Sequence, residues 1–461
     1  MARRRTAGAA MLACAAVLAA CTGSSGSRGP VEPTTTIASA PQRDAPTVSI
    51  QPLLPSGLAP PDATPCGPFP PRRAAVVAVD GTGAIRWEVP LEPGRYGGAG
   101  PLVDDRRVYT TAGAEVRALD LASGDERWRA PAGGEIYHAW LTGSTVTLVA
   151  RDPGKDGRLL ALRRTDGSTA WEWLAPGAGI YGDPFLLGTD AIAAVTMDGE
   201  LVVRDLSSGD VRWSVPGNRQ PGVVAAAGVV VRADEGLLRA YRARDGAALW
   251  TIAADVRRYI TVTADTVVGS TSNGVQSFGL FDGAPRTSYS PPGPTRSSWT
   301  TDAGLFTQVG WPRPEWQLTD PATGDVKWHS EVTGQLNGPP LVLGADLVTL
   351  EDPGDSRTQI AARRLSDGVV GWGVVFDGSS RTMVARAGGG VLAAGSAPGQ
   401  ALKGQLTAVG DGEVLWSAVL PELVERAPAA LADGGAVVQV VTPVSVCANS
   451  GSSAAVPAVS G

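Results

Sequence analysis

Short runs of alternating apolar and polar residues fill the chain from about residue 75 to residue 446, as in Val116–Asp120 and Leu201–Asp205. Such alternation is typical of strands with one buried face. Asp-Gly or Ser-Gly dipeptides separate many neighbouring runs, and glycine there allows the positive φ of a tight hairpin. Two further apolar runs precede the hairpin, as in Pro101–Val103 and Arg107–Thr110, and helical spacing is absent. The pattern predicts an all-β chain built from units of four short strands.

One frame repeats through this region: a glycine in a turn is followed four residues later by a tryptophan. Successive turn glycines lie 37 to 44 residues apart, and eight of the 13 tryptophans fall into the frame. A ninth turn contains Gly283, with Thr287 where the tryptophan is expected. Four strands in a period of about 40 residues are typical of a β-propeller blade. The glycine and tryptophan pairs are Gly83/Trp87, Gly124/Trp128, Gly167/Trp171, Gly209/Trp213, Gly246/Trp250, Gly324/Trp328, Gly368/Trp372 and Gly412/Trp416.

The first complete unit resembles the repeat of pyrroloquinoline-quinone-type (quinoprotein-like) propellers. The resemblance rests on Gly100-Pro101, Val108-Tyr109, Ala118-Leu119-Asp120, Ser123-Gly124 and Trp128. It implies that the tryptophan of each blade lies flat against the next blade and docks the two together. By resemblance this role falls to Trp87, Trp128, Trp171, Trp213, Trp250, Trp328, Trp372 and Trp416. Because Thr287 departs from the pattern, we expect its blade to dock less well.

The number of blades follows from the turns and the two ends. Nine hairpin turns give eight complete periods, and one strand pair is left over at each end, at residues 75–89 and 429–446. These two halves can complete each other and close the ring. The count then gives nine blades, whereas seven or eight are usual for the family. The sequence therefore predicts a single propeller of eight or nine four-stranded blades over residues 66–447.

The N-terminus has the features of an export signal. Arg3, Arg4 and Arg5 precede 14 apolar residues, Ala7–Ala20, which is too short a stretch to span a bilayer. Leu18-Ala19-Ala20-Cys21 resembles the lipobox of bacterial lipoproteins, which implies cleavage after residue 20 and lipid attachment to Cys21. The alternative is an ordinary secretory signal with a chance cysteine. Residues 21–65 and 448–461 are rich in small and polar residues, and we expect a disordered tether and tail.

Two cysteines remain once Cys14 is removed with the signal and Cys21 is acylated. Cys66 lies just before the first leftover strand pair, and Cys447 directly follows the last one. Disulfides persist outside the cytoplasm. We therefore expect a bond between Cys66 and Cys447 that fastens the ring, the alternative being two unrelated free thiols.

Motifs for catalysis are not found. The resemblance implies an adjacent cysteine pair in quinone-dependent enzymes, and this chain has none. Of the two histidines, His138 falls on an expected channel-facing strand and His329 on an outer strand, too far apart in sequence for a zinc motif. The Gly-x-Gly-x-x-Gly match at residues 177–182 lacks a following helix and is interpreted as a turn between blades. The acidic loops at 152–157 and 351–355 lack the alternating ligands of a calcium loop. We predict no catalytic residue, metal or cofactor.

Two classes of function stay open. The net charge is −6 without a basic run, which argues against nucleic acid as partner. The anchor, tether and repeat resemble the propeller lipoprotein of the outer-membrane barrel-assembly machine. This implies a monomeric scaffold, lipid-anchored outside the cytoplasm at the cell surface or in the periplasm, that binds envelope proteins or polymers. The composition would also suit a Gram-positive cell, which has no such machine. The alternative is a small-ligand or quinone-binding redox propeller that uses its central channel.

Overall fold

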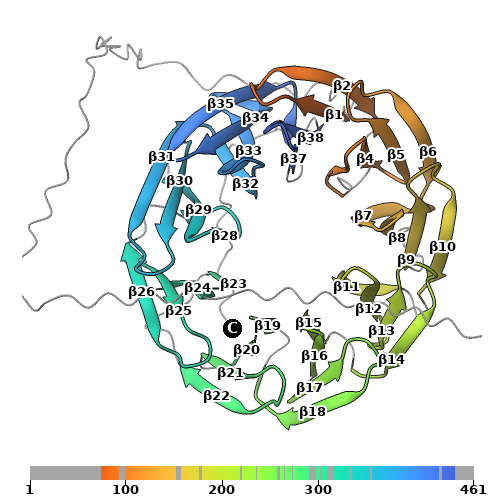
Figure 1. Cartoon of the computed structure of the whole chain (residues 1–461), viewed down its shortest axis with the longest axis vertical. Coiled ribbons are helices and arrows are strands. Elements are labelled where there is room, and N and C mark those ends of the chain that lie inside the picture. Colours follow the sequence, from red (N-terminus) through yellow and green to blue (C-terminus); the bar gives the residue numbers. More distant parts are fainter. Residues whose placement is uncertain are drawn as a thin grey trace, which may run out of the picture. The chain divides into compact units, whose positions relative to one another are not determined.

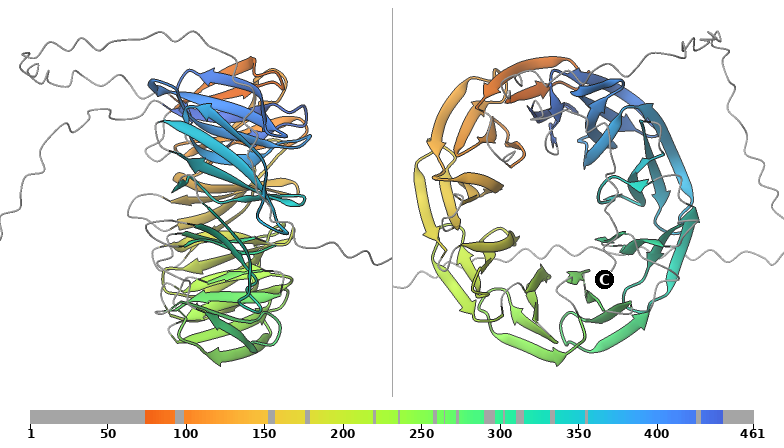
Figure 2. Two further views of the ribbon diagram at one scale, coloured as in Figure 1. Left: turned by 90° about the vertical axis from the view of Figure 1, so that its left-hand side faces the viewer. Right: turned by 180° about the vertical axis from the view of Figure 1, so that it is seen from behind.

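Nine antiparallel sheets form a closed ring around a central channel (Figure 1). The computed structural model describes residues 74–441 apart from 93–98, 152–156, 176–178, 219–220, 235, 257–259, 264, 272–273, 290–296, 302, 310–314, 332–334, 354–355 and 425–427. Seen edge-on, the blades form a single layer (Figure 2). The predicted all-β propeller is confirmed, with nine blades. Among the residues described, no helix is long and apolar enough to cross a membrane.

Each blade pairs its strands in chain order, so that the first strand faces the channel and the fourth lies at the rim (Figure 1). We number the blades along the chain from the first complete unit. Blades 1 to 4 consist of β3 (Leu102–Val103), β4 (Arg107–Ala112), β5 (Glu115–Asp120) and β6 (Glu126–Pro131); β7 (Glu135–Thr142), β8 (Thr145–Arg151), β9 (Gly157–Arg163) and β10 (Thr169–Leu174); β11 (Ile180–Leu187), β12 (Ala191–Thr196), β13 (Leu201–Asp205) and β14 (Val211–Val215); and β15 (Gly222–Ala226), β16 (Val229–Asp234), β17 (Leu237–Arg242) and β18 (Ala248–Ala253).

The next four blades follow the same order, and in blade 7 the first strand is split in two. They consist of β19 (Ile260–Val262), β20 (Thr266–Ser270), β21 (Val275–Gly279) and β22 (Pro285–Tyr289); β23 (Ser297–Thr301), β24 (Gly304–Val309), β25 (Glu315–Thr319) and β26 (Val326–Glu331); β27 (Gln335–Leu336), β28 (Leu341–Leu343), β29 (Asp346–Asp352), β30 (Arg357–Arg364) and β31 (Val370–Asp377); and β32 (Ser379–Ala385), β33 (Val391–Ala397), β34 (Gln400–Gly410) and β35 (Glu413–Leu420).

Blade 9 is shared between the two ends of the folded chain. Its inner half is formed by β36 (Leu423–Val424), β37 (Ala429–Ala430) and β38 (Ala436–Val441), and its outer half by β1 (Ala74–Val79) and β2 (Ile85–Leu91). Strand β38 pairs antiparallel with β1, from Ala74 opposite Val441 to Val79 opposite Ala436. The two leftover strand pairs therefore complete one blade, which settles the count at nine.

The turn chemistry explains the recurrent Asp and Gly of the repeat. In blade 1, the carboxylate of Asp120 accepts hydrogen bonds from the backbone N–H groups of Ala122 and Ser123. The Arg127 guanidinium, which donates to the same carboxylate at 2.6 Å, and these N–H groups lower the pKa of Asp120 to about 2. Gly124 then adopts a φ of 78°, a conformation that a side chain disfavours.

The hydrophobic core is divided among the interfaces between blades. Alternate residues of each sheet face the preceding and the following blade, so apolar side chains from two blades interlock. Eight buried clusters result, and each joins two neighbouring blades. Within the described ranges, no such cluster joins blades 5 and 6.

The predictions for the two ends of the chain lie outside the described residues. These are the signal at 1–20, the tether at 21–65 and the tail at 448–461, together with Cys21, Cys66 and Cys447. They stay predictions.

Candidate functional site

The eight tryptophans of the repeat all lie on the fourth strands, at the boundary with the next blade. In six of them the indole N–H donates a hydrogen bond of 2.8–3.0 Å to a backbone carbonyl of the next blade, three residues before the turn glycine. The pairs are Trp87 with Leu121, Trp128 with Arg164, Trp171 with Leu206, Trp213 with Ala243, Trp250 with Leu280 and Trp328 with Leu365.

The turn glycine of the next blade lies directly against each of these rings. A Cβ atom added at Gly209 would lie 2.7 Å from the ring of Trp171, and one added at Gly246 would lie 2.7 Å from the ring of Trp213. Both distances are too short for a real contact, so glycine is required by close approach as well as by its positive φ. Each of these tryptophans therefore contacts the turn glycine of the next unit, 33 to 40 residues later in the chain, and not the glycine four residues before it.

Two tryptophans and one threonine differ from this pattern. Trp372 contacts Gly412 through its Cβ, at 3.0 Å from the position of an added Cβ. There the turn is a two-residue hairpin with positive φ at Asp411 and Gly412. The buried indole nitrogen of Trp416 has no hydrogen-bond partner among the described residues. Thr287 occupies the equivalent place on β22, where its N–H donates to the Ser277 hydroxyl of its own blade.

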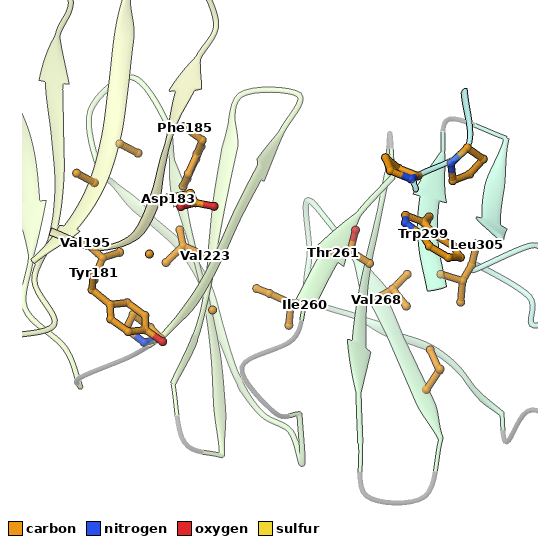
Figure 3. A pocket seen from close by; sticks show the side chains of 18 residues that line it. Tyr181, Asp183, Phe185, Val195, Val223, Ile260, Thr261, Val268, Trp299 and Leu305 are labelled. Carbon is orange, nitrogen blue, oxygen red and sulfur yellow. The ribbon is translucent and has the colours of Figure 1, made fainter. Parts of the chain in front are cut away.

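The channel contains a cavity of about 690 Å³ that touches blades 3 to 7. Its walls are mainly aliphatic, aromatic and proline side chains, with Asp183 as the charged group (Figure 3). This volume lies within the range of small-molecule sites. The lining side chains labelled in Figure 3 are Tyr181, Asp183, Phe185, Val195, Val223, Ile260, Thr261, Val268, Trp299 and Leu305.

Irregular inner strands bring a second, polar pocket next to this cavity. The register of β11 shifts between Tyr181 and Phe185, across the Gly182-Asp183-Pro184 segment, and β7 shifts between Ile136 and His138. Such bulges redirect side chains. Nε2 of His138 lies 2.8 Å from Oδ1 of Asp183, and the His138 ring stacks on Trp140 with centroids 5.8 Å apart. The pocket measures about 180 Å³.

The histidine positions agree with the sequence prediction. His138 lies on the channel-facing strand β7, and His329 is exposed on the outer strand β26. Of the glycine-rich match, Gly179 lies at the passage from β10 to β11, between two blades, and Gly182 lies within β11. Among the described residues, no group of three or more His, Cys, Asp or Glu side chains is placed to hold a metal ion.

Sequence reasoning missed two buried ion pairs, each formed within a single blade, blade 4 or blade 7. Nε of Arg232 lies 2.8 Å from Oδ1 of Asp234, and Nη1 of Arg363 lies 2.7 Å from Oε1 of Glu351. All four side chains are almost completely buried. The available signal was a charged residue inside an apolar strand, as in Val229–Asp234. These pairs form part of the interfaces between blades and lie apart from the channel cavity.

Comparison with known proteins places the chain in a family. A family model described as the outer membrane protein assembly factor BamB matches residues 72–227 and 302–461, more than half of the chain. The chain belongs to this family. The unmatched segment, 228–301, includes Thr287 and all of blade 5. No curated protein matches the sequence.

Solved structures resemble the chain at low sequence identity. BamB from Moraxella catarrhalis is 17% identical over 64% of this chain and 89% of its own, with a TM-score of 0.42. A eukaryotic initiation factor is 10% identical over 79% and 98%, with a TM-score of 0.53. The dihydro-heme d1 dehydrogenase NirN is 13% identical over 78% and 75%, with a TM-score of 0.50. Because the ring occurs in an enzyme as well, the fold alone does not decide the function.

Proposed function

We propose that this chain is a lipid-anchored scaffold outside the cytoplasm that binds envelope proteins or polymers and carries out no catalysis. The observation that carries the proposal is the match of most of the ring to a family described as an assembly factor. A closed ring of nine blades also suits this role, since it offers fixed loop faces with little ordering cost on binding.

The alternative is a ligand-binding or redox role for the channel, favoured by the 690 Å³ cavity. A quinone cofactor with several carboxylates needs cationic partners. The lining of this cavity contains no Lys, Arg or His side chain, and its one charged group is the carboxylate of Asp183, which does not fit such a group. The absorption spectrum of the purified protein tests for a bound quinone, because quinones absorb at longer wavelengths than the aromatic side chains of the protein.

Co-purification tests the scaffold role. The full chain, isolated from membranes in mild detergent, is expected to retain one or a few envelope proteins in fixed ratio. The control is residues 1–65 fused to an unrelated folded protein, which keeps the predicted anchor and tether but lacks the propeller. Proteins retained equally by both would be bound through the anchor, and the scaffold proposal would then fail.

The anchor is tested separately. Cys21→Ser removes the thiol that would carry the diacylglycerol, and we expect the protein to move from the membrane fraction to the periplasm or medium. Several acyl chains give stable anchoring, so the shift should be nearly complete. A variant that stays with the membrane, or a mature N-terminus without acyl chains by mass spectrometry, would contradict the anchor.

A further inference from the structure

We call the interface between blades 5 and 6 the seam. Within the described residues it lacks the docking tryptophan and the buried apolar cluster that join other neighbouring blades. Thr287 stands where the other eight interfaces have a tryptophan. Eight core clusters join the other pairs of neighbouring blades, and within the described residues none joins these two. The two clusters on either side belong to blades 4 and 5 and to blades 6 and 7.

Strand pairing shows which residues face the seam. In blade 5, Val267 and Phe278 pair with each other and pack toward blade 4, so Val268 and its partner Ser277 face blade 6. Ser277 in turn pairs with Thr287. Val275 on β21 and Thr266 on β20 lie on the same face, so the blade 5 side of the seam combines two valines with hydroxyl side chains.

The blade 6 side of the seam likewise mixes apolar residues, Leu305 and Val309, with polar ones. Phe306 and Leu318 pack toward blade 7, so Leu305, which pairs with Thr319, faces blade 5. The neighbouring pair, Thr307 and Gln317, faces the seam too. Thr307, Gln317 and Thr319 are buried, and the Gln317 side chain donates to Thr319 of its own blade. Buried polar groups that bond within a blade add little attraction across an interface.

The channel cavity opens onto this seam. Val268 of blade 5 faces blade 6, and Leu305 of blade 6 faces blade 5. Both side chains line the cavity, together with Ile260 on β19 and Trp299 on β23 (Figure 3). A molecule in the cavity therefore touches both sides of the seam. The walls set its chemistry: their side chains are mostly aliphatic and aromatic, with the hydroxyls of Tyr181 and Thr261 beside them, and the one carboxylate, that of Asp183, already contacts His138. An uncharged, largely apolar ligand with a few hydrogen-bonding groups fits these walls, because charge would be desolvated without a partner.

We infer that the cavity binds an uncharged, largely apolar ligand, and that this ligand holds blades 5 and 6 together. Opening of the seam separates the two walls and removes contacts on one side of the ligand. The ligand thus prefers the closed ring, and it shifts the ring toward closure by that difference in affinity. The inference is independent of the scaffold function and of the lipid anchor.

A neutral fluorophore, 6-propionyl-2-(dimethylamino)naphthalene, tests the site on the full chain carrying Cys21→Ser, which removes the need for detergent. Saturable binding with a blue-shifted emission is expected. Ile260→Asp, which places a carboxylate in the cavity wall, should weaken binding by at least tenfold. The matched control is Val211→Asp on the outer strand β14, where Val211 is 51% exposed, and it should bind like the parent. Equal binding by both variants would place the probe elsewhere and overturn the site.

Hydrogen exchange tests the coupling to the seam. Without the probe, amides of β20–β25 should exchange faster than those of β12–β17 at the interface of blades 3 and 4. At a free probe concentration of about 100 times Kd, exchange through seam opening should slow by up to roughly 100-fold, with little change in β12–β17. Thr287→Trp should slow the same amides without the probe, since Pro321 offers a carbonyl three residues before Gly324. Equal exchange at both interfaces without the probe, or equal protection of both by it, would refute the inference.

Discussion

Trp213 provides the sharpest test of how the ring is held together. It is 8% exposed, its indole donates to the Ala243 carbonyl at 2.8 Å, and its ring centroid lies 6.1 Å from that of Tyr241 in the next blade. Burying a tryptophan removes on the order of 200 Å² from water, which at about 25 cal/mol per Å² is worth about 5 kcal/mol. Trp213→Ala should therefore lower the free energy of unfolding by about 3–5 kcal/mol.

Urea unfolding followed by circular dichroism measures this cost. The control is Leu174→Ala on the outer strand β10, because Leu174 is 58% exposed and its loss should cost less than about 1 kcal/mol. The midpoint should fall with an unchanged m-value. Equal losses in the two variants would refute the assignment of Trp213 to the docking of blades.

A double-mutant cycle isolates the contact itself. Gly246→Ala brings a Cβ to 2.7 Å from the Trp213 ring and adds strain at a φ of 69°. In the Trp213→Ala background the indole ring is absent, so Gly246→Ala costs only the strain at positive φ, about 1 kcal/mol. Gly246→Ala should therefore lower the free energy of unfolding clearly more in the parent protein than in the Trp213→Ala variant. An identical cost in both backgrounds would show that the ring and the glycine do not touch.

Two further predictions concern the closure of the ring and its pH dependence. Non-reducing peptide mapping of the exported protein should find Cys66 and Cys447 in one linked pair, whereas alkylatable thiols would refute the bond. Burial raises the pKa of Asp104, but hydrogen bonds from the Arg106 N–H, the Arg164 guanidinium and the Tyr109 hydroxyl outweigh it and lower the pKa from 3.8 to about 2. The resulting stability, about 2 kcal/mol, is present above pH 4 and lost as the pH falls through 2. Asp104→Asn should therefore destabilise the protein by about that amount at pH 7 and by progressively less below pH 4; a pH-independent cost would contradict this origin.

The repeat could be predicted from the sequence because one contact dictates it. Each blade needs a turn glycine with positive φ that receives the indole of the preceding blade, and a tryptophan that contacts the turn glycine of the next blade. Both residues are present in eight of nine blades. The sequence predicted either eight or nine blades, because seven or eight are usual for the family and the turns indicate nine. The pairing of β38 with β1 resolves the count, which the two leftover strand pairs had already favoured.

The channel cavity could not be predicted in the same way. Its lining comes from strands and connections of five blades, with a few residues from each, such as Val223 on β15 and Ile260 on β19. No spacing in the sequence links such residues, because their proximity is created by closure of the ring. His138 could be placed on an inner strand from the repeat, but its approach to Asp183 depends on irregularities in β7 and β11.

The pairing of the first strand with the last also sets an order of folding. Residues 74 and 441 lie opposite each other, so this contact has nearly the largest sequence separation that the folded part allows, and such contacts form slowly. Until β38 arrives, β1 keeps one edge and an Ala- and Val-rich surface without their partner. A chain that emerges N-terminus first must therefore keep this incomplete blade, with its exposed apolar surface, until β38 has emerged. Its vulnerability to aggregation is greatest just before the ring closes, and a truncation that removes only β38 would leave the chain in that state permanently.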